Sequence, residues 1–174
     1  MREIFIIGTI HDKNLMNIKE LSDILEKIKP DQLLIEIEEE DLNHESFYYK
    51  PYPNEMVCAY YWAKDNKIKV NGFDYDICVL KNISKRKLDK VLININKKIK
   101  GFDWKEFNKK ENRRLFDEDD EKSIDKKKWI KREKIMLTNI YNKMVKNGKI
   151  VILTGVGHLD FFEKNIKGAK FLLE

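Results

Sequence analysis

Two kinds of hydrophobic period alternate along the start of the chain. Residues 3–8 (Glu-Ile-Phe-Ile-Ile-Gly) are a short apolar run ending at a glycine, typical of a strand buried on both faces. From residue 15 to 28 apolar residues recur at helical spacing, with Asn14 as candidate N-cap and Pro30 just past the end. Residues 32–37 form a second apolar strand, so this strand–helix–strand unit predicts a right-handed parallel crossover.

The same alternation continues to the end of the chain. The later predicted elements are a helix from Pro53 to Asn66, a strand at 67–72, a long helix from Trp129 that Gly148 closes at its C′ position, a strand at 149–154, a short helix at 160–165 and an edge strand at 169–173. We therefore predict one α/β domain over residues 1–174. It should be a three-layer sandwich with a central, mostly parallel sheet of four to five strands and helices on both faces.

Composition excludes several classes of protein. With 42% hydrophobic and 37% charged residues and only 7 Gly and 3 Pro, the 174 residues fit neither a collagenous nor a disordered chain. No 18 apolar residues run together and the first apolar run is too short for a signal peptide, so we expect a cytoplasmic protein with no membrane partner. Cys58 and Cys78 lack Cys-x-x-Cys spacing, and we expect buried free thiols.

Charge divides the chain unevenly beneath a net charge of +5. Residues 1–80 carry 9 basic and 16 acidic side chains, whereas residues 81–150 carry 23 and 11. Within the basic part, residues 81–128 read as a Lys-rich helical insertion or lid, with an amphipathic helix near 85–98 and a mobile acidic linker in 116–128. Such polarity makes an acidic partner worth considering.

Nucleic acid is one such partner, because three aromatic residues are interleaved with the lysines: Trp104, Phe107 and Trp129. No recognised nucleic-acid motif is present, and lysine-rich helices are commonly solvated faces. The sequence therefore argues against nucleic acid as a partner.

Two of the predicted strands end in the same short motif. The first runs into Gly8-Thr9-Ile10-His11 and the fourth into Gly155-Val156-Gly157-His158, with Gly8, Gly155 and Gly157 as backbone turns. In a parallel sheet these residues lie just beyond the carboxyl ends of strands, where open α/β sheets bind ligands. A lone histidine after a glycine is more often a turn residue, but repetition at two strand ends favours a functional pair.

Two carboxylates reach the same predicted edge. Glu36 lies inside Leu-Leu-Ile-Glu-Ile, where burial requires a cation, a metal or a proton as partner. Asp74 follows the third strand, although it could simply begin a turn. His11, Glu36, Asp74 and His158 suit Zn, Mn or Fe better than Mg alone. We therefore expect a divalent metal held by His11, Glu36 and His158, with Asp74 bonded to a ligating histidine.

Arg132 lies at the edge of the apolar face of the long predicted helix, with Met136 and Ile140 one and two turns on. A guanidinium there would orient Glu36 or bind a substrate oxygen, and the alternative is an exposed member of a basic cluster. His44 lacks a strand-end context, and we expect it at the surface.

The order of these motifs resembles a known family. The matching elements are strand-Gly-Thr-Ile-His, the strand Leu-Leu-Ile-Glu36, the segment Arg132-Glu133-Lys134-Ile135-Met136, and Gly155-Val156-Gly157-His158-Leu159. They resemble the TraB/PrgY group with its GumN and Tiki relatives, placed among proteins similar to erythromycin esterases and ChaN. The chain departs from that pattern in lacking an arginine within 37–41 and in carrying Tyr75 where an arginine is common.

The resemblance implies an α/β fold with a site built from His11, Glu36, Arg132 and His158, and in Tiki-like members a metal-dependent protease. We accordingly expect a metal-dependent hydrolase acting on a peptide or a small ester or amide, with these four residues as its catalytic groups. A histidine–glutamate pair that activates water without metal is an open alternative. So is a regulatory or peptide-binding protein without turnover. Nothing in the sequence indicates an oligomeric state.

Overall fold

A computed structural model describes residues 1–12, 15–44, 47, 50, 52–116 and 122–172. Its strands are β1 (Arg2–Thr9), β2 (Gln32–Ile35), β3 (Lys69–Gly72), β4 (Gly148–Gly155) and β5 (Ala169–Phe171). Its helices are α1 (Ile18–Ile28), α2 (Glu39–His44), α3 (Asn54–Asp65), α4 (Lys85–Ile99), α6 (Lys126–Lys143) and α7 (Leu159–Asn165), with 3₁₀ turns at Trp104–Asn108, Arg113–Phe116 and Val156–His158. This order follows the predicted alternation of strands and helices.

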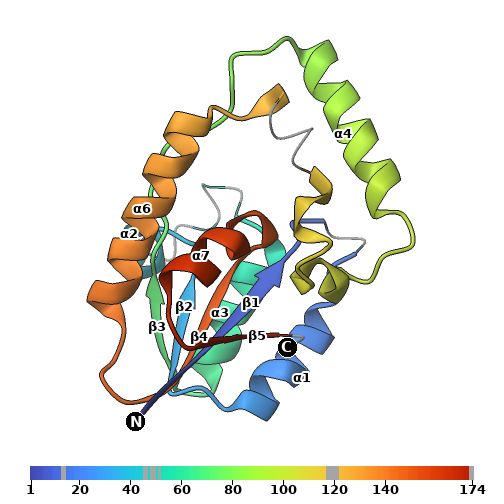
Figure 1. Cartoon of the computed structure of the whole chain (residues 1–174). Helices are drawn as coiled ribbons and strands as arrows, with labels where there is room; N and C mark the ends of the chain where they lie inside the picture. Colours follow the sequence, from blue (N-terminus) through green and yellow to red (C-terminus); the bar gives the residue numbers. More distant parts are fainter. Residues whose placement is uncertain (13–14, 45–46, 48–49, 51, 117–121, 173–174) are drawn as a thin grey trace.

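The five strands form one parallel sheet in the order β3-β2-β4-β1-β5 (Figure 1). This confirms the predicted parallel α/β architecture. The two strands that end in Gly-x-x-His are direct neighbours, and their register pairs Gly8 with Thr154 and Thr9 with Gly155. Because the strands are parallel, both histidine loops leave the same edge of the sheet side by side.

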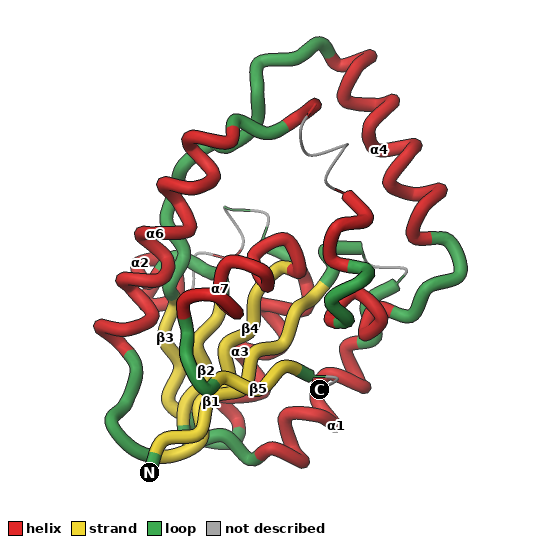
Figure 2. Tube along the Cα trace, in the orientation of Figure 1, coloured by secondary structure: helices red, strands yellow, loops and turns green. Residues whose placement is uncertain are grey.

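Alternate residues of the strands pack into two separate cores, so the sheet has helices on both faces. One core joins the strands to α1 and α3, and its members include Leu21, Leu25, Leu33, Met56 and Val151. The other joins the opposite face to α6 and α7, and includes Ile6, Ile152, Met136, Ile140 and Phe162. The predicted three-layer sandwich is therefore present, with layers visible in Figure 2.

Several element ends differ from the predictions. Asn14 lies outside the described residues, and α1 is capped instead by Asn17, whose side chain accepts from the Glu20 N–H at 3.1 Å. The helix α6 ends at Lys143 rather than at Gly148, because the Val145 N–H donates to the Gln32 side chain at 2.9 Å. Helix ends are thus decided by partners distant in sequence.

Gly148 begins β4 with φ +102°, and a Cβ there would lie 2.5 Å from Oδ2 of Asp31. The glycine is therefore required by the sheet and not by a helix C-cap.

The prediction for the cysteines was half wrong. Both are free thiols, but Cys58 is only partly buried and Cys78 is exposed, because the segment after β3 leaves the sheet and runs over the surface. Asp41 is a buried acidic residue near the start of the chain's second helix. It is 8% exposed within α2, where the Tyr52 hydroxyl and the Lys50 ammonium donate to its carboxylate.

The segment after β3 forms an arm on which α4 stands away from the sheet (Figure 1). The helix covers the predicted range 85–98. Of the acidic linker predicted in 116–128, residues 117–121 lie outside the described residues, and residues 126–128 are helical because they begin α6. In the described part of the chain, no helix combines the length and apolar content needed to cross a membrane.

Candidate functional site

A cavity of about 280 Å³ lies at the carboxyl ends of the central strands. It is lined by Thr9, Ile10 and His11 from the β1 end, Glu36 from the β2 end, Gly155, Val156, Gly157 and His158 from the β4 end, Trp129 and Arg132 from α6, and Ile95 from α4. Four of the residues singled out from the sequence thus share one cavity: His11, Glu36, Arg132 and His158. Asp74 lies directly behind it, bonded to Arg132.

The Glu36 carboxylate is at the centre of the site and is only 7% exposed. Its Oε2 accepts from the Thr154 hydroxyl and from the Gly155 N–H, both at 2.7 Å, and its Oε1 accepts from Arg132 Nη2 at 3.0 Å. Burial by itself would raise the pKa of Glu36, but the charges of His158 and Arg132 outweigh it and lower that pKa far below its ordinary value. Glu36 is therefore an anion at neutral pH.

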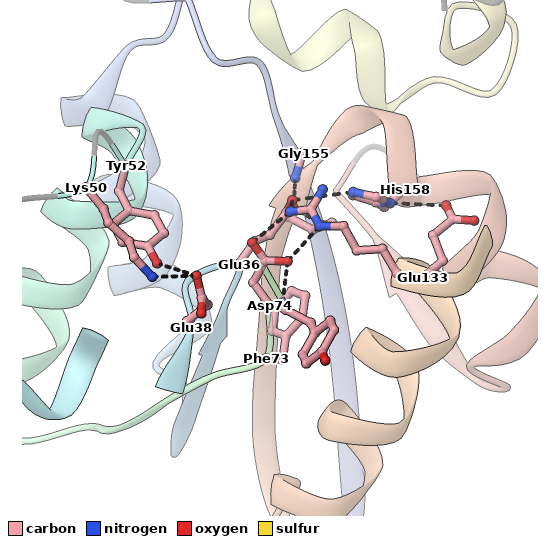
Figure 3. A network of polar contacts seen from close by, with 12 residues as sticks. Glu36, Glu38, Lys50, Tyr52, Phe73, Asp74, Glu133, Gly155 and His158 are labelled. Carbon is pink, nitrogen blue, oxygen red and sulfur yellow. Dashed lines mark hydrogen bonds and ion pairs between the residues drawn. The ribbon is translucent and has the colours of Figure 1, made fainter. Parts of the chain in front are cut away.

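Arg132 joins the two predicted carboxylates. Its Nε and Nη2 donate to Asp74 at 2.9 and 2.7 Å, and Nη2 also donates to Glu36 at 3.0 Å. Figure 3 shows Glu36, Asp74 and His158 within one network of polar contacts. The buried Glu36 thus has the cationic partner that its sequence context required. The expectation that Asp74 bonds a histidine was wrong, because the fork of the guanidinium takes both of its oxygens.

His158 is held between two carboxylates and is 2% exposed. Its Nδ1 lies 3.1 Å from Glu133 Oε1 and its Nε2 lies 3.4 Å from Glu36 Oε1. The imidazole also stacks on Trp129, with ring centroids 4.3 Å apart. Burial opposes protonation, but the two anions prevail and raise the pKa of His158 to about 9. His158 is therefore an imidazolium at neutral pH.

His11 is held from one side only. Its Nδ1 lies 2.6 Å from Oε1 of the buried Glu55, and its side chain remains 44% exposed. Burial lowers the pKa of His11, but the bond to Glu55 and the charge of Glu36 outweigh it and raise that pKa above its ordinary value. The Nε2 faces Gly155, where a Cβ would lie only 3.0 Å away.

The predicted turn glycines make room for these groups. A Cβ on Gly8 would lie 2.6 Å from Leu159 Cδ1, and one on Gly155 would crowd the His11 ring. At Gly157 the nearest atoms, those of Trp129, are 3.4 Å away, so this position is ordinarily packed. Close approach thus disfavours a side chain most strongly at Gly8, and a side chain at Gly155 would require the His11 ring to shift.

Three buried polar residues that complete the site had no predicted role: Glu55, Glu133 and Asn108. Glu55 shares the buried stripe of α3 with Met56 and Ala59, and Glu133 lies on the stripe of α6 beside Met136. A carboxylate at an apolar position of a helical stripe was the available signal.

Asn108 is 2% exposed, and its side chain accepts from the Gly8 N–H at 2.7 Å and donates to the Gly8 carbonyl at 2.9 Å. The strand β5 pairs with β1 only as far as Ile6, and the Asn108 side chain makes the two hydrogen bonds that a longer β5 would make with Gly8. No local pattern marked this residue, because its partner lies 100 positions away.

Hydrogen bonds and ion pairs already occupy most of the side-chain atoms that the sequence predicted as metal ligands. Both oxygens of Glu36 already accept hydrogen bonds, and each ring nitrogen of His158 faces a carboxylate. Among the three predicted ligand residues, this leaves Nε2 of His11 as the one atom open to a metal ion. Among the described residues no group of three or more His, Cys, Asp or Glu side chains is arranged to hold a metal ion. The predicted Zn, Mn or Fe stays a prediction.

His44 is exposed at the end of α2, as expected.

Comparison with known proteins adds no identification, since no family model, no curated protein and no solved structure matches this chain.

Proposed function

We propose that this chain is a hydrolase of ester or amide bonds in which His11 is the general base. The observation that carries the proposal is the contrast between two imidazoles at one cavity. His11 has its Nδ1 fixed by Glu55 and its Nε2 toward the cavity, whereas His158 is enclosed by Glu36 and Glu133. One imidazole can therefore accept a proton while the other keeps a positive charge.

The chemistry follows from these two states. Neutral His11 donates its Nδ1–H to Glu55 and accepts a proton from water at Nε2, and the water oxygen bonds to the substrate carbonyl carbon. Negative charge that develops on the carbonyl oxygen is stabilised by the positive charges of His158 and Arg132. The bond to the leaving group then breaks, and the leaving oxygen or nitrogen takes the proton from His11. Glu36 holds both cations in place throughout.

The lining also restricts the substrate. Ile10, Ile95, Trp129 and Val156 give the cavity apolar walls, and its volume of about 280 Å³ suits a small acyl group. We therefore propose a small ester or amide, or the end of a peptide, as substrate.

The test is hydrolysis of chromogenic esters and aminoacyl amides by protein treated with a chelator. The variant His11→Gln should lose at least about a hundredfold in kcat/KM, the size of a general-base contribution. His44→Gln, which changes an exposed histidine on α2, is the matched control and should retain full activity. Equal activity of the two variants, or no hydrolysis by the unaltered chain across the panel, would refute the proposal.

The metal-dependent version is a second candidate, favoured by one observation. The Nδ1 of each imidazole meets a buried carboxylate, which is the arrangement that orients metal-ligating histidines in proteins. Activity that is absent after chelation and returns with Zn²⁺ or Mn²⁺ would replace the metal-free proposal. Peptide binding without turnover would instead support the regulatory alternative.

A further inference from the structure

The arm and the start of α6, residues 80–134, combine exposed aliphatic side chains with excess positive charge. The exposed leucine and isoleucine side chains of the described residues all lie between positions 80 and 130: Leu80 (52% exposed), Leu92 (49%), Ile93 (53%) and Ile130 (49%). Residues 80–134 also hold 20 Lys and Arg against 11 Asp and Glu. Exposed aliphatic side chains and excess positive charge thus occupy the same segment.

The helix α4 has a buried inner face and an exposed outer face. Its inner face is formed by Val91 and Ile99, each 6% exposed, and by Ile95, which lines the site cavity. Ile93 precedes Ile95 by two positions, which places it about 200° around the helix and on the opposite side. Leu92 lies at the border between the faces. Ile93 is therefore exposed because it lies on the outer face of α4.

The outer face is basic. Between Lys85 and Ile99 the helix has six Lys and Arg residues and one acidic residue, Asp89. Arg86, Lys90 and Lys97 lie one or two turns from Ile93 and are exposed. A helix that combines such a face with exposed aliphatic residues has the composition of one that lies in a membrane interface.

The aromatic residues that suggested nucleic acid are not available for it. Trp104 and Phe107 are 1% and 0% exposed and belong to the packed interior, and Trp129 stacks on His158. Binding of single strands depends on aromatic platforms that bases can reach. The exposed groups of the arm are aliphatic instead, and these partition into lipid.

We propose that the outer face of α4 docks onto a negatively charged lipid bilayer. Leu92 and Ile93 enter the boundary between headgroups and acyl chains, while Arg86, Lys90 and Lys97 contact lipid phosphates. Such a contact needs no spanning helix, so it revises the expectation of no membrane partner. It stands apart from the proposed hydrolase, although Ile95 places the cavity about one helix diameter, ~10 Å, beneath the docked face.

The experiment is co-sedimentation of the full chain with vesicles of phosphatidylglycerol and phosphatidylcholine, compared with vesicles of phosphatidylcholine alone. We expect binding to the anionic vesicles only, weakening as NaCl rises from 50 to 500 mM. Each lysine at such a surface contributes about a fivefold factor in affinity, so Lys90→Glu with Lys97→Glu should weaken binding by about 25-fold or more. Leu92→Asn with Ile93→Asn should also weaken it, with little effect of salt on the loss.

The control is Lys164→Glu with Lys167→Glu, which makes the same change in net charge at exposed positions of α7 and the turn after it. It should bind vesicles like the unaltered chain, and circular dichroism should show all variants folded. Equal loss in both charge variants, or no binding to anionic vesicles, would overturn the proposal. Binding of a single-stranded oligonucleotide that the α4 charge variant loses, with no vesicle binding, would assign the face to nucleic acid instead.

Discussion

The stability of this protein should fall as pH rises through 9, because of one buried imidazole. His158 is protonated in the folded chain with a pKa of about 9, against an ordinary value of 6.5. A pKa raised by folding contributes stability that is complete below about pH 6.5 and is lost as pH rises through 9. At 1.36 kcal/mol per unit, the difference corresponds to about 3 kcal/mol.

The measurement is urea unfolding at half-unit steps from pH 6 to 10, for the unaltered chain and for His158→Gln. The unaltered chain should lose about 3 kcal/mol more than the variant across this range, since lysines and His11 titrate in both. The chain has three histidines, so NMR can also follow the His158 ring directly. Parallel stability curves, or an imidazole midpoint at or below 6.5, would refute the reasoning. The same ionisation should limit hydrolysis on the alkaline side near pH 9.

The remaining predictions concern buried partners. Arg132→Met leaves the anionic Glu36 without its guanidinium, and urea unfolding should show a loss of about 3–5 kcal/mol at pH 7 that shrinks as acid protonates the carboxylates. Little change in stability would contradict a buried ion pair. Asn108→Ala leaves the buried N–H and carbonyl of Gly8 unpaired and should cost about 2–5 kcal/mol, with faster amide exchange at Gly8. Asn112→Ala, which removes one bond to a backbone carbonyl, is its control and should cost about 1 kcal/mol.

The positions of the predicted site residues followed from local pattern and one topological rule. Apolar runs ending in glycine identified the strands before His11 and His158, and parallel pairing then required both loops at one edge. The cost of burying a charge required a partner for Glu36, and Arg132 on an apolar helix edge was the candidate. These inferences need only the sequence because each residue is specified by its own strand or helix.

The protonation states of His11 and His158 depended on contacts between elements. Glu55 lies 44 positions from His11 and Glu133 lies 25 from His158, so the packing of α3 and α6 against the sheet decides which carboxylate meets which ring. That packing separates two identical motifs into an open base and an enclosed cation.

The sequence by itself determined the α/β class, the parallel direction of the main strands and the edge where polar groups collect, because hydrophobic period and chain connectivity specify these locally. Tertiary structure alone decided that Asp74 bonds to Arg132, that both oxygens of Glu36 accept hydrogen bonds, and that Trp104 and Phe107 face inward. Hydrogen-bond partners and burial depend on the distances between elements, and those distances result from packing between residues that are far apart in the sequence.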